Sequence, residues 1–517
     1  MSQKRENRRR FLQTGAAGIS ALCFMKDIKA GETVAAQTGA ELNEVTVRQL
    51  QAKMQSGELT ARKITELYLE RIREIDPKLR SVIETNPDAV RIADELDKER
   101  RRGKTRGLLH GIPVLIKDNI DTADKMKTTA GSLALVDAPV PERDAFIVEK
   151  LRKAGAVILG KTNLSEWANF RSTKSISGWS GRGGQANNPY ILDKNPCGSS
   201  AGSGIAVSAN LAAVAVGTET NGSIICPATR NGVVGIKPTL GLVSRSGIIP
   251  IAHTQDTAGP MARTVEDAAI LLSVLVGRDK LDAITNESKK GAKDYTKFLD
   301  KDGLRGARLG VARQFMGNDA AVKQIMEAHF EVLRSSGATL IDVAFSENLG
   351  KLGDDRLQVL LYEFKTDLNK YLAQRNSKYK TLADLIKYNE ENKEREMPLF
   401  GQELFEQAQS KGDLTDKAYL DSLAKIKRAT REEGIDAVIA KDKLDAVIAP
   451  AGGATWSIAA VAGYPYITVP AGFVGGLPFG IGFFGRAFAE PQLIKFAYAF
   501  EQKTKARRTP EFLPTVK

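Results

Sequence analysis

Short apolar runs of strand length alternate with helical patterns along the middle of the chain, from Leu108 to about residue 285. A buried strand is read from a continuous apolar run of a few residues, and a helix from apolar residues every three or four positions. Strands that alternate with helices are typical of α/β folds. We therefore predict a single large α/β domain with a central mixed, largely parallel β-sheet covered by helices on both faces. In chain order the segments read IPVLIKD, DAFIVEKLRKAG, AVILG, AVAVGTET, VVGIKP and TVEDAAILLSVLVG.

Two helical regions flank this core. Residues 45–103 contain three amphipathic patterns, so we predict a helical N-terminal layer there, followed by a catalytic core over about residues 104–285. Residues 350–440 are charged and helical, and they are expected to form a peripheral layer. Residues 446–485 contain no charged side chain, but prolines and many glycines interrupt them. Buried strands and tight turns are therefore expected here instead of a membrane span.

The first 36 residues differ from the rest of the chain. A basic cluster that contains RRRFLQ precedes an uncharged stretch from Thr14 to Met25. The run RRRFLQ resembles a twin-arginine export signal. The uncharged stretch is too short to span a bilayer as a helix, which also favours a signal peptide. We predict a signal peptide over residues 1–36, a mature domain over residues 37–517, export by the twin-arginine machinery and a periplasmic or secreted location. A basic arm or an amphipathic helix is the alternative.

Charge and rare residue types exclude several function classes. The formal net charge is +13, but the basic residues are scattered and lack interleaved aromatic side chains, so no nucleic-acid partner is expected. No membrane association is expected after signal cleavage. The 3 histidines and 3 cysteines have no paired spacing, which predicts no metal site and no cofactor. The mature domain keeps Cys197 and Cys226, and two cysteines do not make a disulfide framework.

Two short motifs match other enzyme patterns by letter only. GAVILGKT at residues 155–162 has the spacing of a phosphate-binding loop, but its Ala-Val-Ile-Leu is itself a buried strand. GSSAG at residues 198–202 has the spacing of a nucleophile elbow with Ser200 at its centre. That elbow needs a preceding strand and a later histidine, and only His253 and His329 follow. We therefore predict neither nucleotide binding nor a Ser-His-Asp hydrolase.

Ser223 lies in a turn that contains glycine and asparagine, GTETNGSIICP. Such a backbone can direct its amides toward a negative charge, as acyl-transfer enzymes do for an oxyanion. A serine nucleophile also needs a base. Lys117 ends the apolar run Ile112–Ile116, and burial there would favour its neutral, proton-accepting form. The alternative for Lys117 is a side chain that extends from the strand end to solvent.

Three longer blocks resemble a known family. They are GIPVLIKDNIDT, the glycine- and serine-rich stretch from CGSSAG past Ser223, and TQDTAGPMARTVEDAA. These blocks resemble the amidase signature family, over about residue 45 to the C-terminal helix. The resemblance implies the amidase signature fold and a Ser–Ser–Lys triad, in which Lys117 is the base, Ser199 the bridging serine and Ser223 the nucleophile. It also implies a cis peptide bond at the bridging serine. The implied oxyanion hole consists of the backbone amides of Thr220, Asn221, Gly222 and Ser223.

The same resemblance implies an amidohydrolase that cleaves linear carboxamides, with release of ammonia through an acyl-enzyme. GTETNGSIICPA and TNLSEWANFRSTKSISGWSGRGGQ look closest to the peptide amidase branch, which removes the terminal carboxamide of peptides. A peptide or small-molecule amide is therefore the expected partner, although the sequence does not identify the residues that bind it.

Three positions depart from the family pattern. Ile225 stands where an arginine is common, Asn221 stands where glycine is frequent, and the segment after Trp456 is short. With Ile225 and Cys226 beside the nucleophile and Trp167–Phe170 nearby, we expect a pocket without a fixed cation for a substrate carboxylate.

Three other functions remain open at this point. One is a broad-specificity aliphatic or aryl amidase, and another is the A-type subunit of a glutamyl-tRNA(Gln) amidotransferase, against which the export signal argues. The third is a catalytically silent protein that binds amides or peptides. The presence of Lys117, Ser199 and Ser223 together argues against the silent protein.

Overall fold

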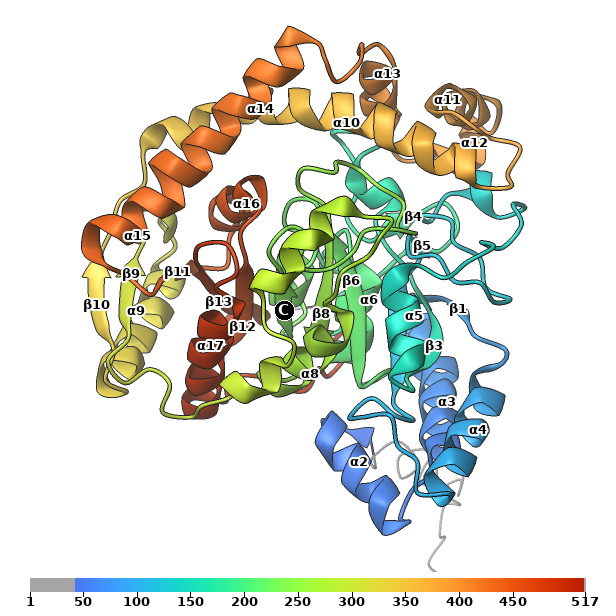
Figure 1. Cartoon of the computed structure of the whole chain (residues 1–517), viewed down its shortest axis with the longest axis horizontal. Coiled ribbons are helices and arrows are strands. Elements are labelled where there is room, and N and C mark those ends of the chain that lie inside the picture. The colour runs from blue at the N-terminus through green and yellow to red at the C-terminus, as the bar shows by residue number, and fades with distance from the viewer. Residues whose placement is uncertain (1–41, 516–517) are drawn as a thin grey trace, which may run out of the picture. The chain divides into compact units, whose positions relative to one another are not determined.

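An eleven-stranded mixed sheet runs through the centre of the molecule (Figure 1). The structure is a computed structural model that describes residues 42–515, which belong to one compact unit beginning at Leu42. The predicted signal peptide lies outside the described residues. From edge to edge the strands are β1 (Val82–Thr85), β3 (Val157–Thr162), β2 (Pro113–Lys117), β6 (Val214–Glu219), β8 (Thr257–Ala262), β7 (Val234–Lys237), β12 (Tyr466–Val474), β13 (Leu477–Phe484), β11 (Ala446–Pro450), β9 (Arg308–Val311) and β10 (Thr339–Asp342).

Parallel pairing is confined to two blocks of this sheet. β3, β2 and β6 pair in parallel, and so do β11, β9 and β10 at the other end. The remaining pairings, those between the blocks and that of β1 with β3, are antiparallel. The expected mixed sheet is confirmed, and the parallel arrangement predicted from alternation with helices holds within each block. One antiparallel pair is a hairpin, in which Gly475 (φ 55°) and Gly476 (φ 79°) join β12 to β13.

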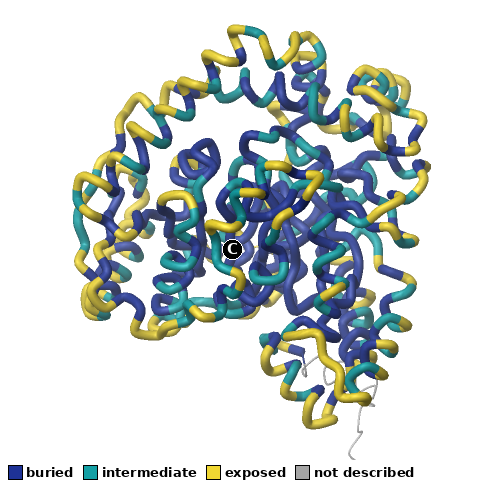
Figure 2. The backbone as a smooth tube through the Cα atoms, viewed as in Figure 1, coloured by how far each residue is buried: buried dark blue, intermediate teal, exposed yellow. Residues whose placement is uncertain are grey.

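Helices pack against both faces of the sheet, as predicted (Figure 1). The short helix α6 (Ala201–Ser208) is buried along its whole length, in the dark interior of Figure 2. Its small residues permit this close packing, since a Cβ on Gly202 would lie 2.3 Å from the carbonyl oxygen of Ser81. The other helices around the sheet are α5 (Phe146–Lys153), α7 (Ile225–Arg230), α8 (Val265–Leu275), α9 (Ala320–Ser335), α16 (Gly453–Ala462) and α17 (Glu490–Thr504).

Residues 45–103 form the expected helical layer, with the edge strand β1 inside it. Its helices are α2 (Val47–Ser56), α3 (Ala61–Leu79) and α4 (Ala89–Arg101). Thr46 and Thr60 cap the first two, each accepting a hydrogen bond from a backbone amide of the first turn. Each helix buries one apolar face against the core cluster, which attaches the layer to the sheet.

Residues 350–442 are helical, as expected, and arch across one end of the molecule in Figure 1. They share a hydrophobic cluster with the core, in which Phe364 and Phe405 pack against Trp167 and Phe170. Their outward faces are exposed (Figure 2). The helices are α10 (Gly353–Gln374), α11 (Leu382–Glu391), α12 (Lys393–Glu396), α13 (Glu403–Gln409), α14 (Lys417–Thr430) and α15 (Asp436–Asp442).

The uncharged segment 446–485 forms β11, α16, β12 and β13, so the prediction of buried strands is correct. Within residues 42–515, no helix combines the length and the apolar run that crossing a membrane requires.

Candidate active site

Lys117 lies at the carboxyl end of β2 and is fully buried. β6 pairs with β2 in parallel, so the carboxyl ends of both strands meet at one edge and Thr218 comes to lie beside the lysine. Lys117 Nζ donates to Ser199 Oγ at 2.7 Å and to Thr218 Oγ1 at 2.8 Å. The predicted strand-end position is confirmed, and the alternative of a side chain extended to solvent is wrong.

Burial lowers the pKa of Lys117 from 10.5 to about 7, and the charges of Asp256 and Glu219 oppose this shift. Desolvation disfavours the ammonium form, whereas a nearby carboxylate favours it. Near neutral pH a large fraction of Lys117 is therefore unprotonated and can accept a proton from the hydroxyl that it contacts.

Ser199 follows a cis peptide bond, Gly198–Ser199, as the family resemblance implies. Its side chain is buried against Lys117, and its carbonyl accepts the amide of Ser165 at 3.0 Å. The backbone on one side and the lysine on the other thus hold the hydroxyl in one place.

Ser223 lies in the turn between β6 and α7 and is 8% exposed. Its carbonyl accepts the amide of Ser200 at 3.1 Å, which places the segments that carry Ser199 and Ser223 side by side. Among the described residues, no hydrogen-bond partner is recorded for Ser223 Oγ. The structure therefore brings the three predicted residues into one site and forms the Lys117–Ser199 link directly.

The four predicted oxyanion-hole amides share this turn. The amides of Thr220, Asn221 and Ser223 have no acceptor among the described residues, so they are available to a ligand. Gly222 has φ 81°, and its amide lies near the Glu219 carboxylate. Three of the four predicted donors are thus unengaged, whereas Gly222 faces a protein carboxylate.

Glu219 shapes this turn from inside. Its Oε2 accepts the amides of Ile224 at 2.7 Å and of Ile225 at 3.0 Å. Burial raises the pKa of Glu219, against the charge of Lys237 and these amides. The carboxylate thus satisfies two amides at the start of α7 and fixes the backbone that follows the nucleophile.

Asp256 supports the other side of the turn, a role that was not predicted from the sequence. Its Oδ1 accepts the Thr220 hydroxyl at 2.5 Å, and its Oδ2 accepts the amides of Ile251 and Ala252. Burial raises the pKa of Asp256 to about 6, although these hydrogen bonds favour its ionised form. The signal that could have revealed it is its place in the block TQDTAGP, which carries the family resemblance.

Two cavities are lined by residues of the turn. One, of about 480 Å³, is lined by Thr218, Glu219 and Thr220 and reaches α10 at Asp367. The other, of about 640 Å³, is lined by Asn221, Trp456 and Ser457 among others. The turn thus contributes residues to two cavities, and Ser223 itself lines neither of them.

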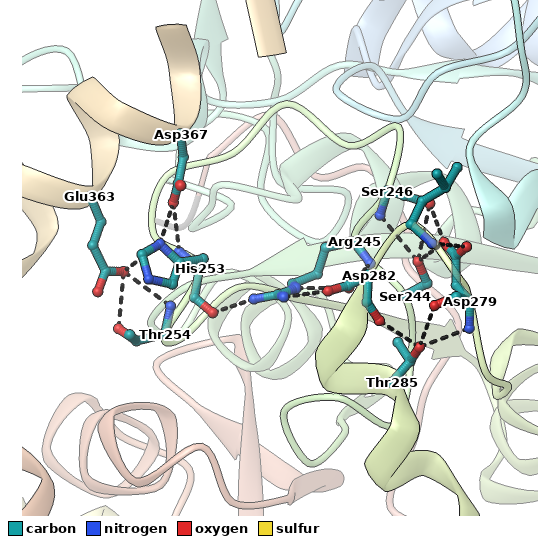
Figure 3. Close-up of polar contacts among 11 residues, drawn as sticks. Ser244, Arg245, Ser246, His253, Thr254, Asp279, Asp282, Thr285, Glu363 and Asp367 are labelled. Atoms are coloured by element: carbon teal, nitrogen blue, oxygen red, sulfur yellow. Dashed lines mark hydrogen bonds and ion pairs between the residues drawn. The ribbon is translucent and has the colours of Figure 1, made fainter. Parts of the chain in front are cut away.

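Figure 3 shows polar contacts along the wall of the 480 Å³ cavity. His253 Nδ1 lies 2.8 Å from Asp367 Oδ2, and the His253 carbonyl accepts Arg245 Nη1. Arg245 also pairs with Asp282. Burial would lower the pKa of His253, but its hydrogen bond with Asp367 and the nearby Glu363 carboxylate raise it overall. These contacts connect the loop that carries Arg245 and His253 to α10.

The amidase family model matches residues 63–458. The chain belongs to the amidase signature family. The crystal structure of native peptide amidase from Stenotrophomonas maltophilia is 50% identical, with a TM-score of 0.87 over 91% of this chain and 99% of that one. An Arabidopsis thaliana protein named "Probable amidase" is 45% identical over 483 residues, which cover 91% of this chain and 92% of that protein. The A-type subunit of the glutamyl-tRNA(Gln) amidotransferase from Thermoanaerobacter pseudethanolicus is 33% identical over 501 residues, covering 91% and 99%.

As a member of this family, the chain is a hydrolase of carbon–nitrogen bonds in amides. The structure also agrees with the prediction that the phosphate-loop and nucleophile-elbow motifs have no such function here. Residues 157–162 of the phosphate-loop look-alike form strand β3. Ser200 Oγ is engaged with the backbone of Thr218, to which it donates at 3.0 Å. His329 Nε2 contacts the carbonyl of Ala471.

The residues predicted to surround the pocket lie in different places. Trp167 and Phe170 pack into the cluster under α10 and Ile225 is fully buried, so these three line neither cavity. Ala168 of the predicted Trp167–Phe170 stretch does line the 480 Å³ cavity. The 480 Å³ cavity has cations in its wall, among them Arg245, which is paired with Asp282. Residues close to the nucleophile in sequence thus differ in whether they reach a cavity or the core.

Among residues 42–515, the only group of side chains with spacing suited to a metal is His253, Glu363 and Asp367, whose candidate ligand atoms lie within 4.8 Å of one another. Glu363 already accepts from Thr254 and Tyr419, and Asp367 contacts His253. These contacts make the group a structural link between the loop and α10.

The structure joins Cys197 and Cys226 in a disulfide, with their Cα atoms 5.8 Å apart. Two cysteines are too few for a disulfide framework, and this single bond was not predicted from the sequence. Two cysteines 29 residues apart carry no pairing signal of their own, because the fold alone brings them together.

Proposed function

We propose that this amidase removes the C-terminal carboxamide of peptides and releases ammonia, with Ser223 as the nucleophile. The observation that carries the proposal is the buried Lys117, which contacts Ser199 Oγ at 2.7 Å and has a pKa of about 7. A base poised near neutral pH is what a serine hydroxyl needs to become a nucleophile.

The proton path follows from this arrangement. Neutral Lys117 takes the proton of Ser199, and Ser199 takes that of Ser223 as its oxygen attacks the amide carbon. The amides of Thr220, Asn221 and Ser223 then stabilise the oxyanion, and one such donor is worth about 3 kcal/mol of barrier. The same path returns a proton to the nitrogen when the carbon–nitrogen bond breaks and ammonia leaves. Water then attacks the acyl-enzyme by the same relay and releases the free acid.

Peptide amides are the proposed substrates for two reasons. A protein named a peptide amidase is 50% identical over nearly its whole length. In addition, a cavity of about 480 Å³ adjoins the turn, a size within the range of ligand sites, and could hold the peptide part of such a substrate. A terminal carboxamide is neutral, so its desolvation in a buried site costs less than that of a carboxylate.

We further propose export by the twin-arginine machinery and action in the periplasm or outside the cell. The run RRRFLQ near the N-terminus motivates this proposal. The Cys197–Cys226 disulfide supports it, because such bonds persist mainly in oxidising compartments.

An A-type amidotransferase subunit is the second candidate, favoured by the 33% identity to one such protein over almost its whole length. Such a subunit would be expected to need its partner subunits. Ammonia release by the purified chain alone favours the peptide amidase.

The test incubates purified mature chain with a peptide amide, the same peptide as the free acid, an amino-acid amide and an aryl amide. Ammonia is measured, and the peptide masses are determined by mass spectrometry, with Ser223→Ala as the control. We expect the intact peptide amide to become the free acid. Shorter fragments would indicate an endopeptidase, whereas equal rates on aryl amides would indicate a broad amidase.

A further inference from the structure

We propose that the Cys197–Cys226 disulfide is a positioning link that holds Ser199 and Ser223 in register for proton transfer. The inference rests on the proposed roles of these serines. Neither cysteine is proposed to touch the substrate.

The disulfide joins the two backbone segments that carry the serines, close to both. Cys197 precedes Ser199 by two residues, and Cys226 follows Ser223 by three, while the Cα atoms of the cysteines are 5.8 Å apart. Between the serines the chain runs through α6 and β6 and returns. The link therefore closes a loop of 29 residues at the point where the two hydroxyls must meet.

A buried side chain reinforces the same junction. Asn231 Nδ2 donates to the carbonyl of Pro196 at 2.9 Å and to that of Pro227 at 2.7 Å. Pro196 precedes Cys197, and Pro227 follows Cys226, so the amide spans the residues next to the disulfide. This second link keeps the segments together when the disulfide opens, which predicts a folded but less active protein.

The two serines depend on the link to different degrees. Ser199 is also held by Lys117 Nζ and by the amide of Ser165. Ser223 Oγ has no hydrogen-bond partner among the described residues. Its backbone is held by the Ser200 amide, which donates to the Ser223 carbonyl, and by Glu219, which accepts the amides of the next two residues. Opening the disulfide should leave the Lys117–Ser199 contact intact and loosen the position of the nucleophile. A misplacement of about 1 Å can reduce catalysis by about 10²-fold.

The experiment compares the oxidised wild type with Cys197→Ser, Cys226→Ser and the double variant. We measure kcat and KM for a peptide amide, the rate at which a fluorophosphonate labels Ser223, and Tm. A thiol-free phosphine reductant opens the same disulfide without a substitution. Both cysteines are only half-buried in the folded protein, so the reductant can reach them.

We expect kcat and the labelling rate to fall 10- to 100-fold, with KM changed less than threefold, in chains that remain folded at the assay temperature. The double variant should match either single one, because each substitution opens the same bond. Reductant should reproduce the loss in the wild type, reoxidation should reverse it, and the double variant should not respond.

A folded double variant with kcat within twofold of wild type would overturn the proposal, as would a loss that only follows the unfolded fraction. If a variant does not fold, the reductant arm on the wild type decides, and an unchanged kcat after verified reduction overturns the proposal. Failure of the proposed function looks different, because a wild type that releases no ammonia from any amide can still show the effect of the disulfide on Ser223 labelling.

Discussion

At the scale of single residues, catalysis depends on the protonation of Lys117. Burial brings its pKa to about 7, against the charges of Asp256 and Glu219. The reactive form is the neutral one, so kcat/KM should rise with pH through about 7 and then level off. A pH–rate profile over pH 5–9 measures this ascending limb, the rise of kcat/KM with pH.

Asp256→Asn tests whether this pH dependence belongs to Lys117. Loss of this carboxylate removes a charge that favours the ammonium form, so the midpoint of the limb should move to lower pH, whatever happens to its height. A midpoint that stays fixed or moves to higher pH would contradict the assignment of Lys117 as the base.

The three residues of the relay should act as one unit. Ser223→Ala should abolish hydrolysis, and Ser199→Ala or Lys117→Ala should each lower kcat by several orders of magnitude. A Ser199→Ala/Lys117→Ala double variant should be hardly worse than the poorer single one. Ser203→Ala, in the first turn of α6 and hydrogen-bonded to Thr162, is the control with near-normal kcat. Simple multiplication of the single defects would refute a shared proton path.

At the scale of elements, His253 and Asp367 connect the loop that carries Arg245 and His253 to helix α10. Burial would lower the pKa of His253, but Asp367 and Glu363 raise it overall. A raised pKa means that this contact stabilises the fold fully below about pH 6.5, the unfolded value, and less as pH rises through the folded value.

We therefore expect Asp367→Asn to lower Tm most at acidic pH, with the difference from wild type shrinking above the folded pKa of His253. Calorimetry across pH 5–9 tests this dependence. Asp355→Asn on the same helix removes an ion pair with Lys425 and is the control, since no histidine is involved. A Tm difference that does not vary with pH would show that His253 remains neutral.

At the scale of the whole molecule, the N-terminal segment should decide where the enzyme works. Arg8→Lys with Arg9→Lys should retain the protein in the cytoplasm with residues 1–36 attached, because an ammonium lacks the planar guanidinium geometry. Cell fractionation and the N-terminal mass test this prediction. Arg10→Lys, at the variable position after the pair, is the control that should still be exported. Normal delivery of the double variant would mean that the segment has another role.

Much of the site could be predicted from the sequence because its chemistry is carried by local pattern. Lys117 ends an apolar run, and Ser223 lies in a turn of small residues, so the strand end and the unengaged amides follow from neighbouring residues. The triad assignment, including Ser199, came from the long blocks shared with the family. The alternation of strands and helices likewise predicted the α/β class, because secondary-structure periodicity is a local property.

The surroundings of that site were decided only by tertiary structure. Asp367 on α10 reaches a cavity that also contains Thr220, although 147 positions separate them in the chain. Trp167, which is closer to Thr220 in sequence, packs away from both cavities. The pairing of Cys197 with Cys226 also needed the return of the chain through α6 and β6. No sequence periodicity relates the residues that make these contacts. The contacts depend on how buried surfaces pack together, which is a property of the whole fold.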